Sequence, residues 1–155
     1  MAEPSALFKK LNLGAHTLIH VLNAPASFAA ELAALQRVTV KRAVSGPVGF
    51  GMAFVITQAQ RDEASAKLAA ASVGDAILWM VYPKGTSKKY RCEFNRDSGW
   101  ATLGAAGFEP VRMVAIDEDW SALRFRRVEH IKTLTRSPAQ RISKAGQQKA
   151  ARRGI

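Results

Sequence analysis

Hydrophobic residues in this chain gather into short continuous runs, separated by stretches with helical spacing. Apolar runs of about 4–8 residues are typical of strands that are buried on both faces. The pattern predicts strands over Thr17 to Leu22, Val38 to Val44, Phe50 to Thr57, Ala76 to Tyr82, Val111 to Ile116 and Leu123 to Val128. Helices are predicted over Ala26 to Gln36, Gln58 to Ala71 and Ser98 to Ala106. The expected order is therefore β-α-β-β-α-β-α-β-β.

The predicted helices differ in the signals that support them. The first places Phe28, Leu32 and Leu35 at helical spacing. The second is rich in Ala, Lys and Glu and is expected to be exposed. The third has Asp97 as a possible N-terminal cap and Gly107 as its end.

The order of elements predicts a single three-layer α/β domain over residues 1–131. Alternating strands and helices favour a mostly parallel central sheet that is covered by helices on both faces. The last two strands are joined by the short segment 117–120, so they must be antiparallel and form a C-terminal hairpin. This layout resembles the Rossmann-like methyltransferase fold, and Phe50 to Val128 looks like the second half of that fold.

Two spaced motifs give a closer resemblance. The first is LWMVYPKG and the second is VAIDEDWSALRF, with a glycine-terminated helix between them. They resemble an uncharacterised bacterial family, a DUF3052-like domain of unknown function, over roughly the second half of the chain. The matching positions are Trp79, Pro83, Lys84, Trp120, Ser121, Ala122 and Arg124. The resemblance implies a fold and no established activity.

Charge is distributed unevenly along the 155 residues. The net charge is +11, and residues 132–155 hold seven Lys or Arg with no Asp or Glu. Without this tail, 16 basic and 12 acidic residues remain, a net charge of +4. We expect a basic tail that is flexible or helical, and an excess charge of this sign favours anionic partners. A single cysteine, no membrane-spanning run and no secretory signal predict a cytoplasmic monomer or homodimer.

The turn after the first predicted strand argues against a nucleotide cofactor. Such a cofactor needs glycines there, because backbone amides must approach it closely. This chain has Asn23-Ala24-Pro25-Ala26-Ser27, in which proline lacks an amide hydrogen and alanines add side chains. The second predicted strand also ends in Lys41 and Arg42, where an acidic residue would hold the ribose. The Gly49 to Gly51 segment precedes a predicted strand and does not replace the missing turn. We therefore expect no cofactor.

No catalytic or metal-binding group emerges from the remaining residue types. His16 and His20 would share one face of a strand, but no carboxylate or cysteine cluster lies near them, which favours a core or edge pair. Cys92 lies among basic residues that could lower its pKa. A nucleophile also needs a base, and none is identifiable, so an incidental thiol is favoured. The acidic run 117–119 could bind a cation, although a solvated turn is the commoner role.

A cluster of cations follows the strand that ends at Tyr82. In open α/β sheets, ligands bind at the carboxyl ends of the strands, where this cluster is expected to lie. Tyrosines interleave the cations, a combination that suits nucleotides or single-stranded nucleic acid. The alternative is a solvated loop whose lysines only maintain solubility. The predicted ligand-binding residues are Tyr82, Lys84, Lys88, Lys89 and Arg91.

These features favour a non-catalytic binding protein that contacts an anionic partner, either nucleic acid or a nucleotide. One alternative is a divergent transferase that uses S-adenosylmethionine, and another is a protein-interaction subunit that uses exposed sheet edges. The sequence further predicts that Trp120 opens the last strand and is buried, and that Ala122 faces a crowded neighbour.

Overall fold

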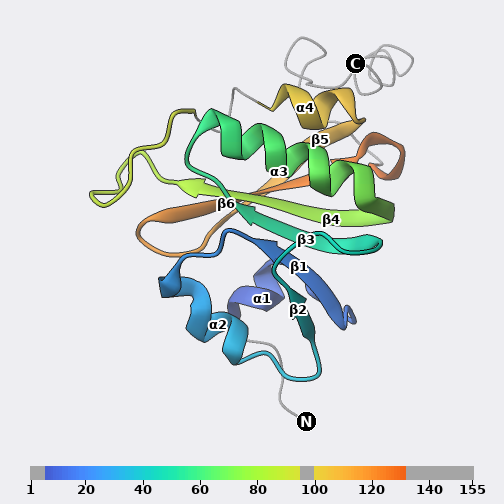
Figure 1. The fold of residues 1–155 in the computed structure, drawn as a ribbon, viewed down its shortest axis with the longest axis horizontal. Coiled ribbons are helices and arrows are strands. Elements are labelled where there is room, and N and C mark those ends of the chain that lie inside the picture. Colours follow the sequence, from blue (N-terminus) through green and yellow to red (C-terminus); the bar gives the residue numbers. More distant parts are fainter. Residues whose placement is uncertain (1–5, 95–99, 132–155) are drawn as a thin grey trace.

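The computed structural model describes residues 6–94 and 100–131. Within these residues, six strands form one sheet in the order β2-β1-β3-β4-β6-β5 (Figure 1). The strands are β1 Leu18–Leu22, β2 Thr39–Lys41, β3 Val48–Phe54, β4 Ser72–Pro83, β5 Phe108–Ala115 and β6 Trp120–Arg127. The α-helices are α1 Ala6–Lys10, α2 Ala29–Ala33, α3 Gln58–Ala71 and α4 Ala101–Ala105, with 3-10 turns η1 Ala26–Phe28 and η2 Val128–His130. The predicted order of strands and helices is confirmed, with α1 added at the start.

The strand directions confirm the predicted sheet. β1 pairs in parallel with both β2 and β3, and β3 pairs in parallel with β4. β6 runs antiparallel to both β4 and β5, which makes the predicted C-terminal hairpin.

Helices cover both faces of this sheet. In Figure 1, α1 and α2 lie on one side of it, and α3 and α4 lie on the other. Two hydrophobic clusters fill the layers between the helices and the sheet. Trp79 belongs to the cluster that contains Phe8 of α1, whereas its neighbours Leu78 and Met80 belong to the cluster with Leu68 of α3. Alternate residues of a strand point to opposite faces, so β4 has a fully apolar stretch because both faces are covered.

The connection from β2 to β3 is unusually short. Both strands flank β1 in parallel, so the chain must cross β1, and only residues 42–47 are available. Parallel crossovers normally need a dozen or more residues, most often a helix. Here this short segment passes over β1, and Ser45 O accepts a hydrogen bond of 3.0 Å from Nε2 of buried His20. The strand predicted over Val38 to Val44 therefore ends at Lys41, because the next residues form the crossover.

The helices follow the prediction unevenly. α3 has the predicted bounds because Thr57 and Gln60 form a capping box, in which each side chain accepts a hydrogen bond from the other's backbone amide. It is not wholly exposed as predicted, since Ala64 and Leu68 pack into the core. The helix predicted over Ala26 to Gln36 is instead η1 followed by five-residue α2. Asp97 and the tail, 132–155, lie outside the described residues.

Three strands are longer than the apolar runs from which they were predicted. β4 begins at Ser72, immediately after the last residue of α3, while β5 begins at Phe108 and β6 at Trp120. The Gly49 to Gly51 segment lies inside β3 and does not precede it. A Cβ on Gly51 would lie 2.9 Å from Leu68 Cδ2, so the glycine there lets α3 pack closely on the sheet.

Candidate ligand-binding site at the carboxyl edge of the sheet

The loop of residues 84–94 follows β4 at the carboxyl edge of the parallel strands. Its first residues are fixed to the turn between β5 and β6. Lys84 N donates to Asp119 O at 2.8 Å, and the Ser87 hydroxyl donates to Asp119 Oδ1 at 2.8 Å. Ser87 Oγ also accepts hydrogen bonds from the backbone amides of Lys89 and Tyr90. The acidic run is therefore a turn, as predicted, but one that organises the loop.

The far end of the same loop is fixed to the start of α3. Glu93 Oε1 accepts a hydrogen bond of 2.8 Å from Gln58 N, in the first turn of α3, and Glu93 N donates to Ile56 O. A carboxylate at a helix N-terminus is stabilised by the unpaired amides and the helix dipole. The loop is thus held at both ends by neighbouring elements.

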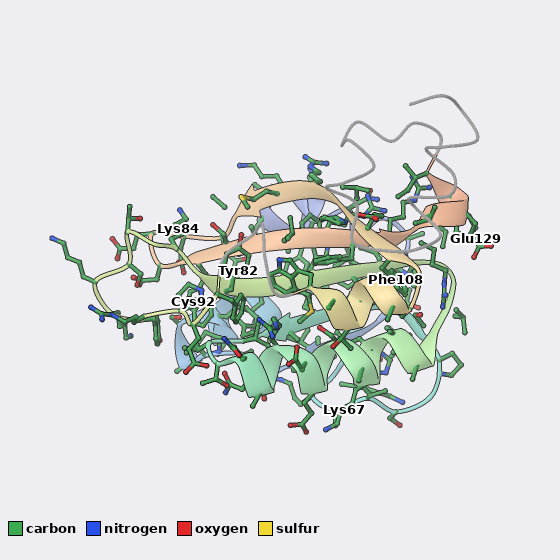
Figure 2. All side chains as sticks on the ribbon, turned by 90° about the horizontal axis from the view of Figure 1, so that it is seen from above. Lys67, Tyr82, Lys84, Cys92, Phe108 and Glu129 are labelled. Atoms are coloured by element: carbon green, nitrogen blue, oxygen red, sulfur yellow. The ribbon has the colours of Figure 1, made fainter. Side chains whose placement is uncertain are left out.

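A cavity of about 310 Å³ lies between this loop and the end of β4. It is lined by Tyr82, Pro83, Lys84, Gly85, Ser87, Tyr90, Arg91, Cys92 and Phe94. Figure 2 shows the labelled residues Tyr82, Lys84 and Cys92 together at one end of the molecule. Three of the five predicted ligand residues, Tyr82, Lys84 and Arg91, line this cavity.

The other two predicted residues do not line the cavity. Lys88 and Lys89 are exposed, and Lys89 Nζ lies 5.5 Å from the centre of the Tyr90 ring. The backbone turns at this point, because Ser87 Oγ accepts hydrogen bonds from the backbone amides of Lys89 and Tyr90.

Cations and aromatic rings share the cavity wall. The side chains of Lys84 and Arg91 form no ion pair with the described residues. The Tyr82 ring packs against Phe94 at 5.9 Å and against Trp100 at 5.8 Å, which limits its movement. The wall can therefore offer positive charge to an anion and a fixed aromatic surface beside it.

The Cys92 thiol differs from the sequence expectation. Burial raises its pKa above the ordinary value, and the nearby Arg61 guanidinium only partly opposes this effect. The basic neighbours in sequence do not lower it. The thiol is therefore mostly protonated at neutral pH, which agrees with the interpretation as an incidental thiol and not a nucleophile.

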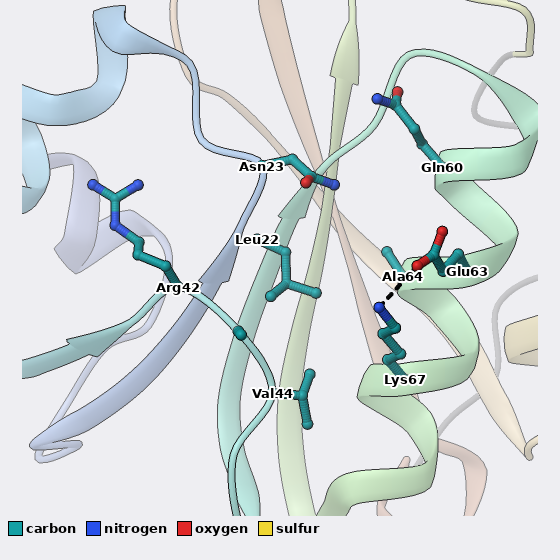
Figure 3. A pocket seen from close by; sticks show the side chains of 9 residues that line it. Leu22, Asn23, Arg42, Val44, Gln60, Glu63, Ala64 and Lys67 are labelled. Atoms are coloured by element: carbon teal, nitrogen blue, oxygen red, sulfur yellow. Dashed lines mark hydrogen bonds and ion pairs between the residues drawn. The ribbon is translucent and has the colours of Figure 1, made fainter.

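A second hollow of about 360 Å³ lies between the crossover and α3 (Figure 3). It is lined by Leu22, Asn23, Arg42, Ala43, Val44, Gln60, Glu63, Ala64 and Lys67. It lies at the end of β1, between the neighbouring strands β2 and β3, which follow β1 in the chain but pair with its opposite edges. Ligands of open α/β sheets usually bind at such a switch point. Lys67 Nζ pairs with Glu63 Oε1 at 2.8 Å, so the charges of α3 in this hollow are balanced.

The remaining predicted residues occupy structural positions. His16 packs beside the Phe50 ring, and His20 is buried under the crossover, so the two do not form a joint site. In the described part of the chain, no three His, Cys, Asp or Glu side chains lie close enough to hold a metal ion. Trp120 opens β6 and is only 3% exposed, and Ala122 is fully buried between Val81 and Val114, as predicted.

Comparison with solved structures identifies the architecture. The pyocyanin biosynthetic protein PhzM has a TM-score of 0.50 and 12% identity to this chain, over 77% of this chain and 52% of PhzM. The N-methyltransferase NodS from Bradyrhizobium japonicum WM9 has a TM-score of 0.49 and 11% identity, over 78% and 92% of the two chains. Magnesium protoporphyrin IX methyltransferase ChlM from Synechocystis PCC 6803, with bound SAM, has a TM-score of 0.44 and 14% identity, over 78% and 74%. The chain has a Rossmann-like methyltransferase fold.

This likeness concerns the fold, and the chain spans about half the length of PhzM. No protein-family model and no curated protein matches the sequence, so the resemblance to the DUF3052-like family stays an expectation. None of the described helices is both long and apolar enough to cross a membrane.

The residues at the end of β1 do not fit S-adenosylmethionine, the cofactor that the fold implies. Asn23 takes the left-handed conformation, with φ of 59°, and Pro25 offers no amide hydrogen in the turn. The Phe28 ring of η1, which follows this turn, is buried and packs against Phe54 at 4.9 Å. Arg42, which follows β2, would also place a cation near a cofactor that itself carries a positive sulfonium.

Proposed function

We propose that the protein binds a nucleotide, a ligand with phosphate and an aromatic base, in the cavity after β4. The observation that carries this proposal is the pair Lys84 and Arg91, two cations that form no ion pair with the described residues, in a cavity that Tyr82 and Tyr90 also line. The Cys92 thiol in this wall is held protonated by burial, and the Ser87 hydroxyl serves to hold the loop to Asp119, so the proposal is one of binding.

The chemistry of the wall matches the two parts of a nucleotide. Arginine can form two parallel hydrogen bonds to a phosphate, and lysine adds a compact positive charge. Aromatic rings stack on any base, and Tyr82 and Tyr90 both line the cavity. The volume of about 310 Å³ is at the lower end of the range of about 300–1,000 Å³ found for small-ligand sites.

The exposed lysines have a different role in this proposal. Lys88 and Lys89 lie outside the cavity wall, so they contribute to the local positive potential and not to direct contacts. Such charges raise the association rate of an anion and are screened by salt. Their removal should slow binding at low salt more than it weakens affinity at high salt.

Titration calorimetry with ATP, AMP and adenosine tests the proposal. We expect ATP to bind, AMP to bind more weakly and adenosine to bind least, because the phosphates carry the charge interaction. Lys84→Gln with Arg91→Gln should weaken ATP binding by about tenfold or more, as expected for lost charge-assisted hydrogen bonds. The structural contact of Lys84 is made by its backbone amide, so this variant should keep its melting temperature.

The matched control removes two arginines from the β5–β6 hairpin, Arg112→Gln with Arg124→Gln, and so causes the same loss of charge. ATP affinity should stay close to that of the parent. Binding of ATP and adenosine with equal affinity, or equal losses in both variants, would contradict a phosphate site in the cavity.

A transferase that uses S-adenosylmethionine is the second candidate, and the observation that favours it is the strand order shared with methyltransferases. The comparisons support this alternative through the fold and give no support to nucleic-acid binding. Calorimetry with S-adenosylmethionine separates the candidates. A dissociation constant weaker than about 1 mM, or about 4 kcal/mol of binding, would end the transferase proposal.

A further inference from the structure

The hollow between the crossover and α3 has an apolar floor. Leu22 at the end of β1 and Ala64 of α3 are 8% and 3% exposed, and half-buried Val44 of the crossover also lines the hollow. Figure 3 shows Leu22 and Val44 directed toward α3. Parallel crossovers usually contain a helix that packs on the sheet. This crossover has none, so a space of about 360 Å³ stays open above these side chains.

Two carboxamide side chains reach the same end of this hollow (Figure 3). Gln60 Oε1 accepts hydrogen bonds from Ile56 N at 2.8 Å and from Thr57 N at 3.1 Å, which fixes the orientation of the side chain. The amino group of Gln60 and the whole carboxamide of Asn23 form no hydrogen bond with the described residues. The hollow therefore offers donors and an acceptor that the protein itself does not use.

An ion pair forms the wall on the side of α3. Lys67 Nζ lies 2.8 Å from Glu63 Oε1, and Figure 3 shows this pair facing the crossover across the hollow. Arg42 also lines the hollow, but its guanidinium is directed away from the pair in Figure 3. The charges that face the hollow are therefore one positive and one negative group side by side.

We propose that this hollow binds an α-amino acid with an apolar side chain. Such a ligand carries a carboxylate and an ammonium group on one carbon. With the carboxylate beside Lys67 and the ammonium beside Glu63, the ion pair and the ligand form an alternating arrangement of charges. The free amide donors bind the carboxylate, and the apolar side chain covers the floor and leaves water. No lining residue is shared with the cavity after β4, so this site goes beyond the nucleotide proposal.

Ligands with a single charge fit this wall less well. A simple carboxylate is attracted by Lys67 and repelled by Glu63, and the reverse holds for a simple amine. An exposed ion pair on a helix is by itself common and contributes little. The argument for a ligand is that the pair, two carboxamides and an apolar floor converge on one hollow at the switch point of the sheet.

An NMR titration of the isotope-labelled full chain tests this site. The probes are leucine, isocaproate, which lacks the ammonium group, isoamylamine, which lacks the carboxylate, and glycine, which lacks the side chain. We expect leucine to shift the side-chain amide signals of Asn23 and Gln60 in a saturable way, because both line the hollow. Each of the three analogues should bind at least about fivefold more weakly, since each loses one of the three interactions.

Two variants locate the binding. Glu63→Gln with Lys67→Gln keeps the net charge and should weaken leucine binding about tenfold. Asn23 has a φ of 59°, which glycine adopts readily, so Asn23→Gly should keep its melting temperature and weaken leucine binding about fivefold. The matched control is Asn12→Gly, because Asn12 has a φ of 63° and follows α1 on the other side of the sheet (Figure 1). It should leave leucine affinity unchanged.

S-adenosylmethionine carries the same two charged groups on a larger body. It should bind no more tightly than leucine, because the residues at the end of β1 do not fit it. Tighter binding of S-adenosylmethionine would make the hollow a site for that cofactor and overturn the proposal. Equal binding of leucine and isocaproate, unmoved signals of Asn23 and Gln60, or equal losses in Asn23→Gly and Asn12→Gly would also overturn it. ATP binding is measured separately, so this proposal and the nucleotide proposal can fail independently.

Discussion

Trp120 is a buried aromatic residue at the start of the last strand. It follows the acidic turn and begins β6, and its ring packs against Phe54 at 5.2 Å and against Tyr90 at 4.9 Å. It therefore links the sheet to the loop that forms the candidate cavity. Its buried Nε1 has no hydrogen-bond partner in the described residues, so its contribution comes from packing.

Trp120→Ala should lower the free energy of unfolding by about 3–5 kcal/mol, a large part of the roughly 5–15 kcal/mol typical of a domain. Trp120→Phe should cost less, because it keeps a ring in contact with Phe54 and removes the unpaired N–H. Urea denaturation of the two variants measures both values. If Trp120→Ala unfolds like the parent, the residue is not the packing anchor described here.

The Asp75–Arg126 pair predicts a dependence of stability on acid. Hydrogen bonds from Arg126 hold the pKa of Asp75 below its ordinary value, against the opposing effect of partial burial. A lowered pKa adds stability at higher pH, and this is lost as pH falls through the folded-state pKa. The free energy of unfolding should therefore fall below about pH 4, and less steeply in Asp75→Asn. Glu63→Gln, which removes a fully exposed pair, should change this acid slope less.

Among the elements, α3 and the crossover show where sequence patterns succeed and fail. α3 was predicted with the bounds that the structure shows, because a long run of strong helix formers, Ala with Lys and Glu, lies in its own residues. α1, α2 and α4 have five residues each, too few to show a period, and they are stabilised by packing on the sheet. Residues 42–44 of the crossover were predicted as strand, because Val44 continues the β-branched pattern of Val38 and Val40.

The capping box of α3 gives a test at this scale. Thr57→Ala should lower the free energy of unfolding by about 1 kcal/mol, because the amide of Gln60 loses its acceptor. Thr57→Ser keeps the hydroxyl and should stay within about 0.5 kcal/mol of the parent. Thermal unfolding followed by circular dichroism measures the difference, and equal losses for both substitutions would show that the hydroxyl bond is not what matters.

The candidate site was only partly visible in the sequence for a similar reason. Tyr82, Lys84 and Arg91 were predicted because a general rule puts ligands at the carboxyl ends of strands. Asp119 was assigned only to a turn, since its contact with Ser87 spans 32 residues. The sequence left a lowered pKa of Cys92 open, and burial raises this pKa instead, because charge is visible in a sequence and depth of burial is not.

At the scale of the whole molecule, two pairs of cations that form no ion pair with the described residues lie in separate regions along β4. Lys84 and Arg91 are at its carboxyl end, whereas Arg124 lies across from Trp79, five residues before Lys84, and Arg112 lies beyond it on β5. The net charge alone could not reveal this separation.

Cys92 is the only cysteine of the chain and lines the cavity after β4, so it reports directly on occupancy there. The most direct test measures the rate at which a thiol reagent labels Cys92 at about pH 8 as the ATP concentration is increased. Labelling is slow even without ATP, because burial raises the pKa of this thiol. ATP should slow the reaction in a saturable way, adenosine should have less effect, and Lys84→Gln with Arg91→Gln should remove the protection. A labelling rate that ATP leaves unchanged at concentrations of several millimolar, typical of weak ligands, would contradict nucleotide binding in this cavity.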